Sequence, residues 1–459
     1  MRAGHVPFWP AYPSHQRRRS IAWLETVMGN TSYISDRPLK IHLLDGRTVD
    51  CRRDWLSQIA ELGLDCYVEH VGNTLEYCWD QAHREVWDRE GCKRLDVRRG
   101  NRFGSLIAIR TWGQQRVNSA VIADIDAVCQ ALGTGPQPSA AGAGMAALRN
   151  AHRGPVVSRP PADCCQALWL SAGARNDVRS DPDTVHERLW EIDLRSAYPA
   201  VAARMPSGPM ARILPDSELD LYQSYYALCR VTIRQRLEIG PFCVRDSSGR
   251  NSYPTEPGTY EAWLWDDEVR ACRAAGCGVD LQRGYGWTSW YSAKDWSAAM
   301  DSARRKFSKR QAAMVKLAAV GAIGCFKNLP RRFQASEILA QVPEGSVAVQ
   351  DGPHGVAGYL MQGNWDHSIM PHWWSYIQMR VRLALYQRQI VEGVEHVVMA
   401  DTDGLYLDRE PVGEMGEEMG SWSLRKVHTN ARVLGPRTLM SDQGRKIPGG
   451  RRLLLHRTA

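Results

Sequence analysis

Short apolar stretches alternate with segments of helical periodicity along the first third of the chain. The pattern predicts strands over 40–44, 64–68 and 105–111 and helices over 53–62 and 117–132. This mixture of short strands and helices indicates an α/β domain.

The pattern remains mixed in the rest of the chain. An apolar strand ends at Asp193, helices are expected over 266–275, 296–324 and 372–391, and a strand–turn–strand is expected over 394–407. A small sheet flanked by helices is therefore predicted here as well.

A segment rich in Gly, Ala and Pro separates the two parts. Residues 134–164 include the stretch TGPQPSAAGAG, and only one short helix is expected among them, near 145–152. We therefore expect a linker between the two domains.

Composition narrows the class of protein. No apolar run reaches the about 20 residues that a membrane-spanning helix needs, and the N-terminus lacks the apolar stretch of a secretory signal. Twelve cysteines occur without a CxxC pair, which argues against a zinc site or a disulfide framework and for a reducing cytosol. The net charge of +8 suits nucleic acid but is shared by many other soluble proteins.

Two carboxylate motifs point to chemistry. Asp193 follows an apolar strand in DLRSAYP, and Asp401 and Asp403 lie in ADTDG between two apolar strands. Asp-Gly is a strong hairpin signal because Gly tolerates positive φ, which leads us to expect that conformation at Gly404. If the two strands are neighbours, Asp193 and Asp403 can share a pair of Mg²⁺ ions about 3.5–4 Å apart.

Each motif alone has an ordinary explanation. A lone Asp-Thr-Asp-Gly turn is more often a solvated hairpin, and a lone DxxSxYP can be an Asx-capped helix start. Both motifs in this order and on these predicted elements make chance a minor explanation.

The two motifs resemble those of family B DNA polymerases. DLRSAYP is similar to motif A (DxxSLYP), ADTDG to motif C (YGDTDS), and KLAAVGAIG at 316–324 occupies the place of motif B (KxxxNSxYG). The stretch AGAR at 172–175 resembles the YxGG element that precedes the palm. The resemblance covers about 165–450 and implies an α+β polymerase palm.

The resemblance implies a metal site and a catalytic cation. Asp193, Asp403 and the Leu194 carbonyl would bind two Mg²⁺ ions, with Mn²⁺ as an alternative, and Asp401 would be an accessory carboxylate. Lys316 would contact the triphosphate.

Substrate-binding positions are implied in two stretches. Tyr198 would stack under the incoming sugar and exclude a 2′-hydroxyl. Val320 and Ile323 stand where the family has Asn and Tyr, so the base-pair contacts are altered. The implied positions are Leu194, Arg195, Ser196, Ala197 and Tyr198 after motif A, and Arg305, Lys309, Val320, Ile323 and Gly324 on one predicted helix with Lys316.

Nucleic-acid contacts are implied on both sides of the motifs. Gly173 and Arg175 belong to the element before the palm, and Arg437 and Lys446 to the region that meets the primer strand. Only 56 residues (459 − 403) follow Asp403, so a full thumb is not expected.

The first domain is expected to be a degenerate RNase H-like, exonuclease-like domain. In Ile21–Thr26 the first carboxylate of the family's DxE pair is replaced by Trp23, while Glu25 is kept. The expected organisation is an exonuclease-like domain at 1–133, a linker at 134–164, palm at 165–300, fingers at 301–330, and palm with a short basic tail at 331–459.

Three functions remain open at this level. The leading one is a template-directed DNA polymerase of phage or mobile-element type without proofreading, acting on primer-template DNA and deoxynucleoside triphosphates in a bacterial cytosol. The second is a template-independent or primer-making nucleotidyltransferase that uses the same carboxylates. The third is a non-catalytic scaffold that binds nucleic acid or protein. A partner protein for priming or processivity is a further expectation, and a membrane partner is not.

Overall fold

The chain forms two compact units. The described residues of the C-terminal unit lie within 153–294 and 326–459, and those of the N-terminal unit lie within 9–152 and 295–325. The computed structural model describes residues 20–25, 40–43, 45, 47–50, 55–69, 94–99, 102–151, 160–169, 171, 173–245, 251–327, 333–335, 347–349, 358–360, 370–446 and 452–453.

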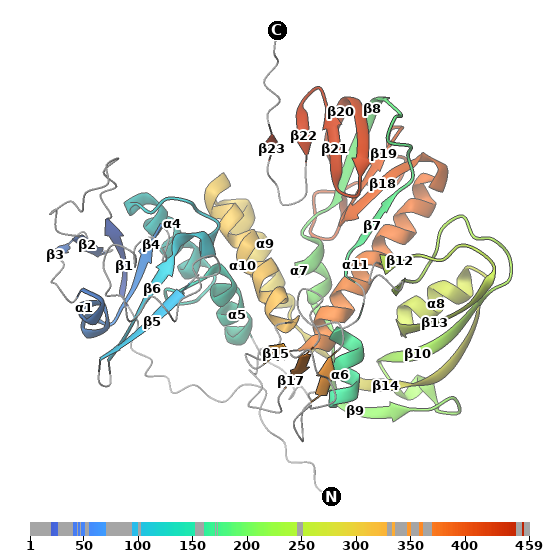
Figure 1. Cartoon of the computed structure of the whole chain (residues 1–459), viewed down its shortest axis with the longest axis horizontal. Coiled ribbons are helices and arrows are strands. Elements are labelled where there is room, and N and C mark those ends of the chain that lie inside the picture. The colour runs from blue at the N-terminus through green and yellow to red at the C-terminus, as the bar shows by residue number, and fades with distance from the viewer. Residues whose placement is uncertain are drawn as a thin grey trace, which may run out of the picture. The chain divides into compact units, whose positions relative to one another are not determined.

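A mixed six-stranded sheet forms the framework of the N-terminal unit (Figure 1). Its order is β3-β2-β1-β4-β6-β5; β1, β4 and β6 are parallel, and the other neighbours are antiparallel. Helix α1 packs on β4, β5 and β6. The bounds are β1 Ser20–Glu25, β2 Lys40–Leu43, β3 Thr48–Asp50, α1 Trp55–Leu62, β4 Leu64–Val68, β5 Arg94–Arg99 and β6 Arg102–Ala108.

The helices of this unit join segments that are distant in sequence. The 3₁₀ turn Ile109–Trp112 leads to α4 (Ser119–Ala131) and α5 (Ala140–Asn150). Two further helices, α9 (Lys294–Lys306) and α10 (Lys309–Lys327), follow the first segment of the C-terminal unit in the sequence. The Arg310 guanidinium in α10 pairs with Asp124 in α4.

Small residues let α5 approach α10 closely. A Cβ atom added to Gly144 would lie 2.1 Å from the Ala318 carbonyl oxygen, and one added to Gly321 would lie 2.9 Å from the Ala141 Cβ. The short helix expected near 145–152 within the linker is present as α5 but begins earlier, at Ala140, because Ala and Gly there serve helix packing rather than flexibility. Helix α6 (Ala162–Trp169) occupies the end of the same stretch.

Two sheets form the C-terminal unit. The larger has the order β23-β22-β21-β20-β8-β19-β18-β7 and the smaller β13-β10-β14-β9. The bounds are β7 Arg175–Val178, β8 His186–Leu194, α7 Ala197–Ala202, β9 Arg204–Ile213, β10 Ser224–Ile233, β13 Gly258–Trp265, α8 Asp266–Ala274, β14 Gly278–Ser292, α11 Pro371–Glu392, β18 Val397–Thr402, β19 Gly404–Leu407, β20 Trp422–Gly435, β21 Thr438–Ser441, β22 Gly444–Lys446 and β23 Arg452–Leu453. Short elements complete it: 3₁₀ turns Leu219–Leu221 and Val394–His396, the pair β11 Val244–Arg245 and β12 Asn251–Ser252, and a small sheet of β15 Phe333–Ala335, β17 Gly358–Leu360 and β16 Val347–Val349.

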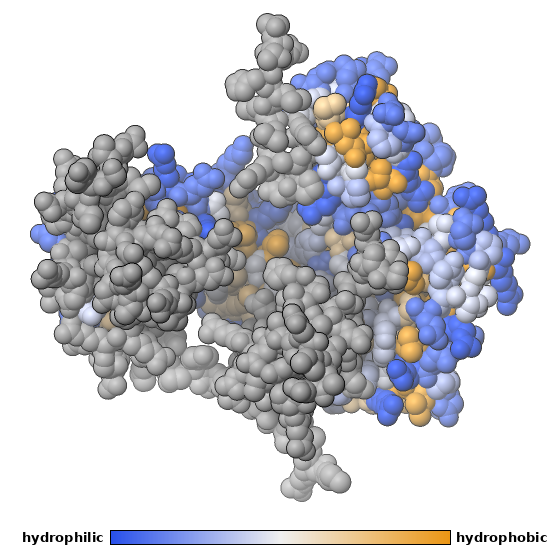
Figure 2. Space-filling model, in the orientation of Figure 1, coloured by the Kyte–Doolittle hydropathy of each residue, from blue (hydrophilic) through white to orange (hydrophobic). Residues whose placement is uncertain are grey.

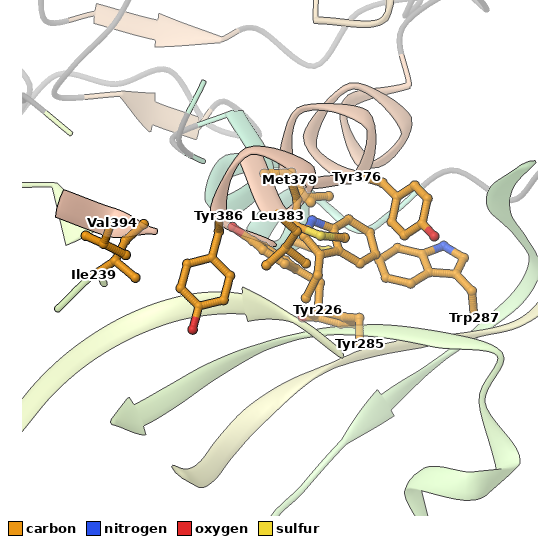
Figure 3. Packing of buried hydrophobic residues seen from close by; sticks show 12 residues of the cluster. Tyr226, Ile239, Tyr285, Trp287, Tyr376, Met379, Leu383, Tyr386 and Val394 are labelled. Atoms are coloured by element: carbon orange, nitrogen blue, oxygen red, sulfur yellow. The ribbon is translucent and has the colours of Figure 1, made fainter. Parts of the chain in front are cut away.

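Helix α11 packs between these two sheets. Towards the smaller sheet, Tyr376, Met379 and Leu383 contact a cluster that includes Trp265 and Trp287 (Figure 3). Towards the larger sheet, Leu385 packs with apolar residues of β8, β18 and β19. Because α11 is covered on most sides, nearly all of its positions are buried, and its exposed positions are Arg380, Gln387, Ile390 and Val391.

Buried ion pairs on α11 hold the surrounding segments. Arg382 Nη2 lies 2.8 Å from Glu268 Oε1 of α8, and both side chains are nearly inaccessible. Glu268 also accepts a hydrogen bond from the Trp265 backbone at the start of α8. Because a buried charge without its partner is costly, loss of either residue would be strongly destabilising.

Where Figure 2 colours the surface by hydropathy, it is mainly hydrophilic, with hydrophobic residues in small groups. Exposed apolar side chains of the described segments include Ile390, Val391, Val412 and Leu424. Among the described helices, none has the length and apolar character needed to span a membrane.

We predict that Gly144→Ala destabilises the N-terminal unit by about 1–3 kcal/mol, because the added methyl group overlaps the α10 backbone. Gly324→Ala is the matched control, since it adds the same group to α10 with nothing within 4 Å. Urea unfolding and amide hydrogen exchange in α5 and α10 would measure both. Equal stability of Gly144→Ala and the parent would contradict the close helix packing.

A second prediction concerns pH. His372 is fully buried and stacked on Trp287 at 5.5 Å between ring centroids, and burial lowers its pKa to about 3. Its folded-state pKa lies below the unfolded value of about 6.5, so the unfolded chain binds more protons between these values and stability falls on acidification. From pH 6.5 to 5, the parent should lose about 2 kcal/mol more than His372→Phe in urea unfolding. Parallel losses in the two proteins would show that His372 does not cause the pH dependence.

Candidate active site

The two motif aspartates lie on neighbouring backbone segments because β8 and β19 are paired antiparallel strands. Asp193, the penultimate residue of β8, lies opposite Gly404, the first residue of β19. The Leu194 amide donates a hydrogen bond to the Asp403 carbonyl at 2.9 Å. The strand–turn–strand expected from the sequence thus presents Asp403 directly beside Asp193.

The turn between β18 and β19 is very tight. The Asp403 amide donates to the Asp401 carbonyl at 2.7 Å, and the residue between them, Thr402, has φ 64°. The expectation of positive φ at Gly404 is therefore wrong, because the γ-type turn is centred one residue before Asp403. Gly404 serves close approach instead: an added Cβ would lie 2.9 Å from the Ile192 carbonyl oxygen and 3.4 Å from Asp193 Oδ1.

Asp401 is engaged by a different part of the sheet. Arg437 Nε lies 3.0 Å from Asp401 Oδ1, and the Thr402 hydroxyl donates to the same oxygen at 3.0 Å. Arg437 stands in the β20–β21 turn with φ 62°, an unusual value for a residue with a side chain. The predicted primer-contacting residue Arg437 thus brings a positive charge to the carboxylate turn.

Asp193 has its own cationic neighbour. Arg425 Nη1 lies 3.9 Å from Asp193 Oδ2 and 3.4 Å from Glu191 Oε1. Burial acts to lower the pKa of Arg425, but the Glu191 and Asp193 carboxylates raise it above its usual value. One guanidinium group, that of Arg425, therefore lies beside the β8 carboxylates, and another, that of Arg437, lies beside Asp401 of β18.

The residues after Asp193 turn sharply into α7. Ser196 precedes the helix with φ 48°, and Ala197 is buried. Arg195 Nη1 pairs with Glu417 Oε2 at 2.7 Å, and its backbone exchanges hydrogen bonds with Ser421 and Gly420. The Arg195 side chain therefore holds the 409–421 loop.

Tyr198 projects from α7 close to the carboxylates. Burial, followed by the negative charge of Asp403, raises the pKa of its hydroxyl well above the usual value, and the Gln378 side chain of α11 hydrogen-bonds to it. Tyr198 is thus a neutral, positioned phenol beside Asp403.

The positions predicted on a single fingers helix fall on two helices of the N-terminal unit. Arg305 belongs to α9, where Nε pairs with Asp301 Oδ2 at 2.8 Å, while Lys309 begins α10. The break has a sequence signal that we missed, the capping box Ser308-Lys309-Arg310-Gln311, in which Ser308 and Gln311 hydrogen-bond reciprocally. The prediction that Arg305 shares one helix with Lys309 and Lys316 is therefore wrong.

The exposed face of α10 also differs from the expected one. Four of the predicted positions are exposed on α10, and their spacing places them on one face of the helix: Lys309, Lys316, Val320 and Gly324. Ile323 is only 2% exposed, so the prediction that it faces a nascent base pair is wrong, because its side chain lies on the packed side of the helix.

The predicted nucleic-acid contacts before motif A are structural. Arg175 is buried, pairs with Asp177, donates to the Gly240 carbonyl at 3.0 Å and stacks on Tyr253. The prediction that Arg175 binds nucleic acid is wrong, because its guanidinium has no access to a phosphate. The Gly173 carbonyl accepts from Arg382 Nη1 at 3.0 Å. Lys446 ends β22, and its side chain lies outside the described residues.

The donor set suits a hard divalent cation. Asp193 and Asp403 supply carboxylate oxygens and the adjacent backbone supplies carbonyls, the ligands that Mg²⁺ prefers. In the described part of the chain, no group of three or more His, Cys, Asp or Glu side chains is arranged around a common point. A metal at this site would therefore depend on the two Asp residues with backbone and substrate oxygens.

Comparison with solved structures defines the class of fold. The chain has a mixed α/β fold similar to that of a DNA polymerase, as expected from the motifs. No family model matches the chain, and no curated protein matches it in sequence.

Similar solved structures include several forms of the Phi29 DNA polymerase. The ternary complex with primer-template DNA and incoming nucleotide has a TM-score of 0.65 at 12% identity, with 92% of this chain and 88% of that chain covered. The binary complex with primer-template DNA has a TM-score of 0.63, and the complex with single-stranded DNA 0.61, each at 12% identity with 92% of this chain and 87% of the other covered. The likeness therefore extends over both units.

Proposed function

We propose that this protein is a template-directed DNA polymerase that adds deoxynucleotides to a primer 3′-hydroxyl. The observation that carries the proposal most is the pairing of β8 with β19, which joins Asp193 and the Asp403 turn on a polymerase-like fold. The DNA and nucleotide in the similar Phi29 complexes support primer-template DNA and deoxynucleoside triphosphates as partners.

Asp193, Asp403 and the Leu194 carbonyl would hold two Mg²⁺ ions, with Mn²⁺ as an alternative. When bound, such ions lower the pKa of an attacking hydroxyl and neutralise the charge of the triphosphate and its leaving group. Asp401 has a separate task, because its carboxylate is held by Arg437 and its turn fixes the Asp403 backbone.

Tyr198 would lie beneath the incoming sugar. Its ring is largely buried at the start of α7, so it has little freedom to move away from a 2′-hydroxyl. Lys316, Lys309, Val320 and Gly324 form an exposed stripe on α10 that would contact the triphosphate and the base pair.

The first domain would contribute no proofreading, since Trp23 replaces the first carboxylate of the exonuclease pair. A partner protein for priming or processivity is part of this proposal. We expect the protein in the cytosol of a bacterium, encoded by a phage or mobile element.

Asp193→Asn and Asp403→Asn should each reduce primer extension to background while leaving thermal unfolding near that of the parent, because each removes a metal ligand but keeps the side-chain shape. Asp401→Asn should retain partial activity. Extension of a labelled primer with Mg²⁺ or Mn²⁺, with and without template, measures this.

Undiminished extension by Asp193→Asn would refute the metal assignment. Equal extension without a template would favour the template-independent nucleotidyltransferase over the polymerase.

Tyr198→Ala should incorporate ribonucleotides that the parent rejects, because removal of the ring opens space for a 2′-hydroxyl. Tyr198→Phe is the matched control and should keep the discrimination, since the ring rather than the hydroxyl forms the barrier. Competition between ribonucleotides and deoxynucleotides measures both. Identical selectivity of Tyr198→Ala and the parent would contradict this role.

A further inference from the structure

A bulge in β20 points a guanidinium at the carboxylates. The pairing of β20 with β8 shifts between Leu424 and Lys426, which leaves Arg425 as the extra residue. Bulges redirect side chains and often occur beside active sites. Arg425 thereby reaches Asp193 Oδ2 at 3.9 Å, although it comes from the strand on the opposite side of β8 from Asp403.

The same guanidinium is anchored by a buried carboxylate. Glu191 lies two residues before Asp193, so both side chains point to one face of β8. Its carboxylate contacts Arg425 at 3.4 Å and accepts a hydrogen bond from His428 Nε2 at 2.8 Å, and the side chain is only 8% exposed. Tyr406, the strand neighbour of Glu191 on β19, also hydrogen-bonds to it. Glu191 is thus fixed from both neighbouring strands.

We propose that Glu191 and Arg425 are a positioning pair that holds Asp193 and sets the affinity of the Asp193–Asp403 site for a divalent cation. This inference rests on the proposed function, because it takes these two carboxylates as the metal ligands. Arg425 offsets the negative charge of Asp193 before a cation binds, and Glu191 limits how far Arg425 can move onto Asp193.

The two members of the pair have opposite effects on metal affinity. Without Arg425, the carboxylates lose one compensating positive charge, so they bind a cation more tightly but with Asp193 less well oriented. Without the charge of Glu191, Arg425 keeps its own charge and pairs more closely with Asp193, so a cation must displace it. The double variant should resemble the one without Arg425, because Glu191 acts through that residue.

Mn²⁺ binding to the protein alone, measured by electron paramagnetic resonance, tests the proposal without any polymerase activity. Arg425→Met should tighten binding by about threefold to tenfold, and Glu191→Gln should weaken it by a similar factor. Arg425→Lys should stay near the parent. Glu191→Gln with Arg425→Met should bind as tightly as Arg425→Met. Arg432→Met removes the same charge from an exposed position of β20 and should change nothing.

The Asp193→Asn variant distinguishes failure of the positioning pair from failure of the metal site. If Asp193→Asn weakens Mn²⁺ binding but Arg425→Met behaves like Arg432→Met, the positioning pair is refuted while the metal site stands. If the double variant binds more weakly than Arg425→Met, Glu191 acts directly and the pair is likewise refuted. If Asp193→Asn binds Mn²⁺ as the parent does, the metal site of the proposed function is refuted and the inference falls with it.

Discussion

The antiparallel pairing of β8 with β19 is the constraint on which the site depends. It sets Asp193 opposite Gly404, and the absent side chain of Gly404 gives the Asp193 carboxylate its space. A shift of one residue would turn Asp193 to the other face of the sheet. The backbone bond from Leu194 to Asp403 fixes the register at this end, and α11 covers the apolar face behind it.

Clustered carboxylates must be compensated if the protein is to fold before any cation arrives. Arg437 pairs with Asp401, and Arg425 lies between Glu191 and Asp193. Both arginines occupy irregular backbone, a turn residue with positive φ and a bulge. Strain and irregularity of this kind are retained where a side chain has to be aimed at a site. The hairpin β20–β21 therefore supplies the positive charges of Arg425 and Arg437, which offset the negative charge of the two Asp motifs.

The elements that carry the motifs were predictable from the sequence, because apolar runs end near Asp193 and Asp401 and a further apolar run follows Gly404. It could not predict contacts that depend on distant strands. Nothing near Arg175 in the sequence indicates that Tyr253 and the Gly240 carbonyl will bury it. Likewise, the sequence around Arg425 does not distinguish it from the other charged residues of its strand. The helix break at Ser308 was predictable, since its capping box is local.

The divergence at motif B has a physical reason within the N-terminal unit. Gly321 replaces the family's Ser and lies against Ala141, and Ala318 and Ala322 meet Gly144, so the small residues of α10 serve contact with α5. Larger polar residues on this side would separate the helices. The opposite face keeps Lys309, Lys316 and Val320 exposed. Close helix packing on one side of α10, with Lys309 and Lys316 exposed on the other, leaves a surface suited to an anionic substrate even though the sequence departs from the motif that it resembles.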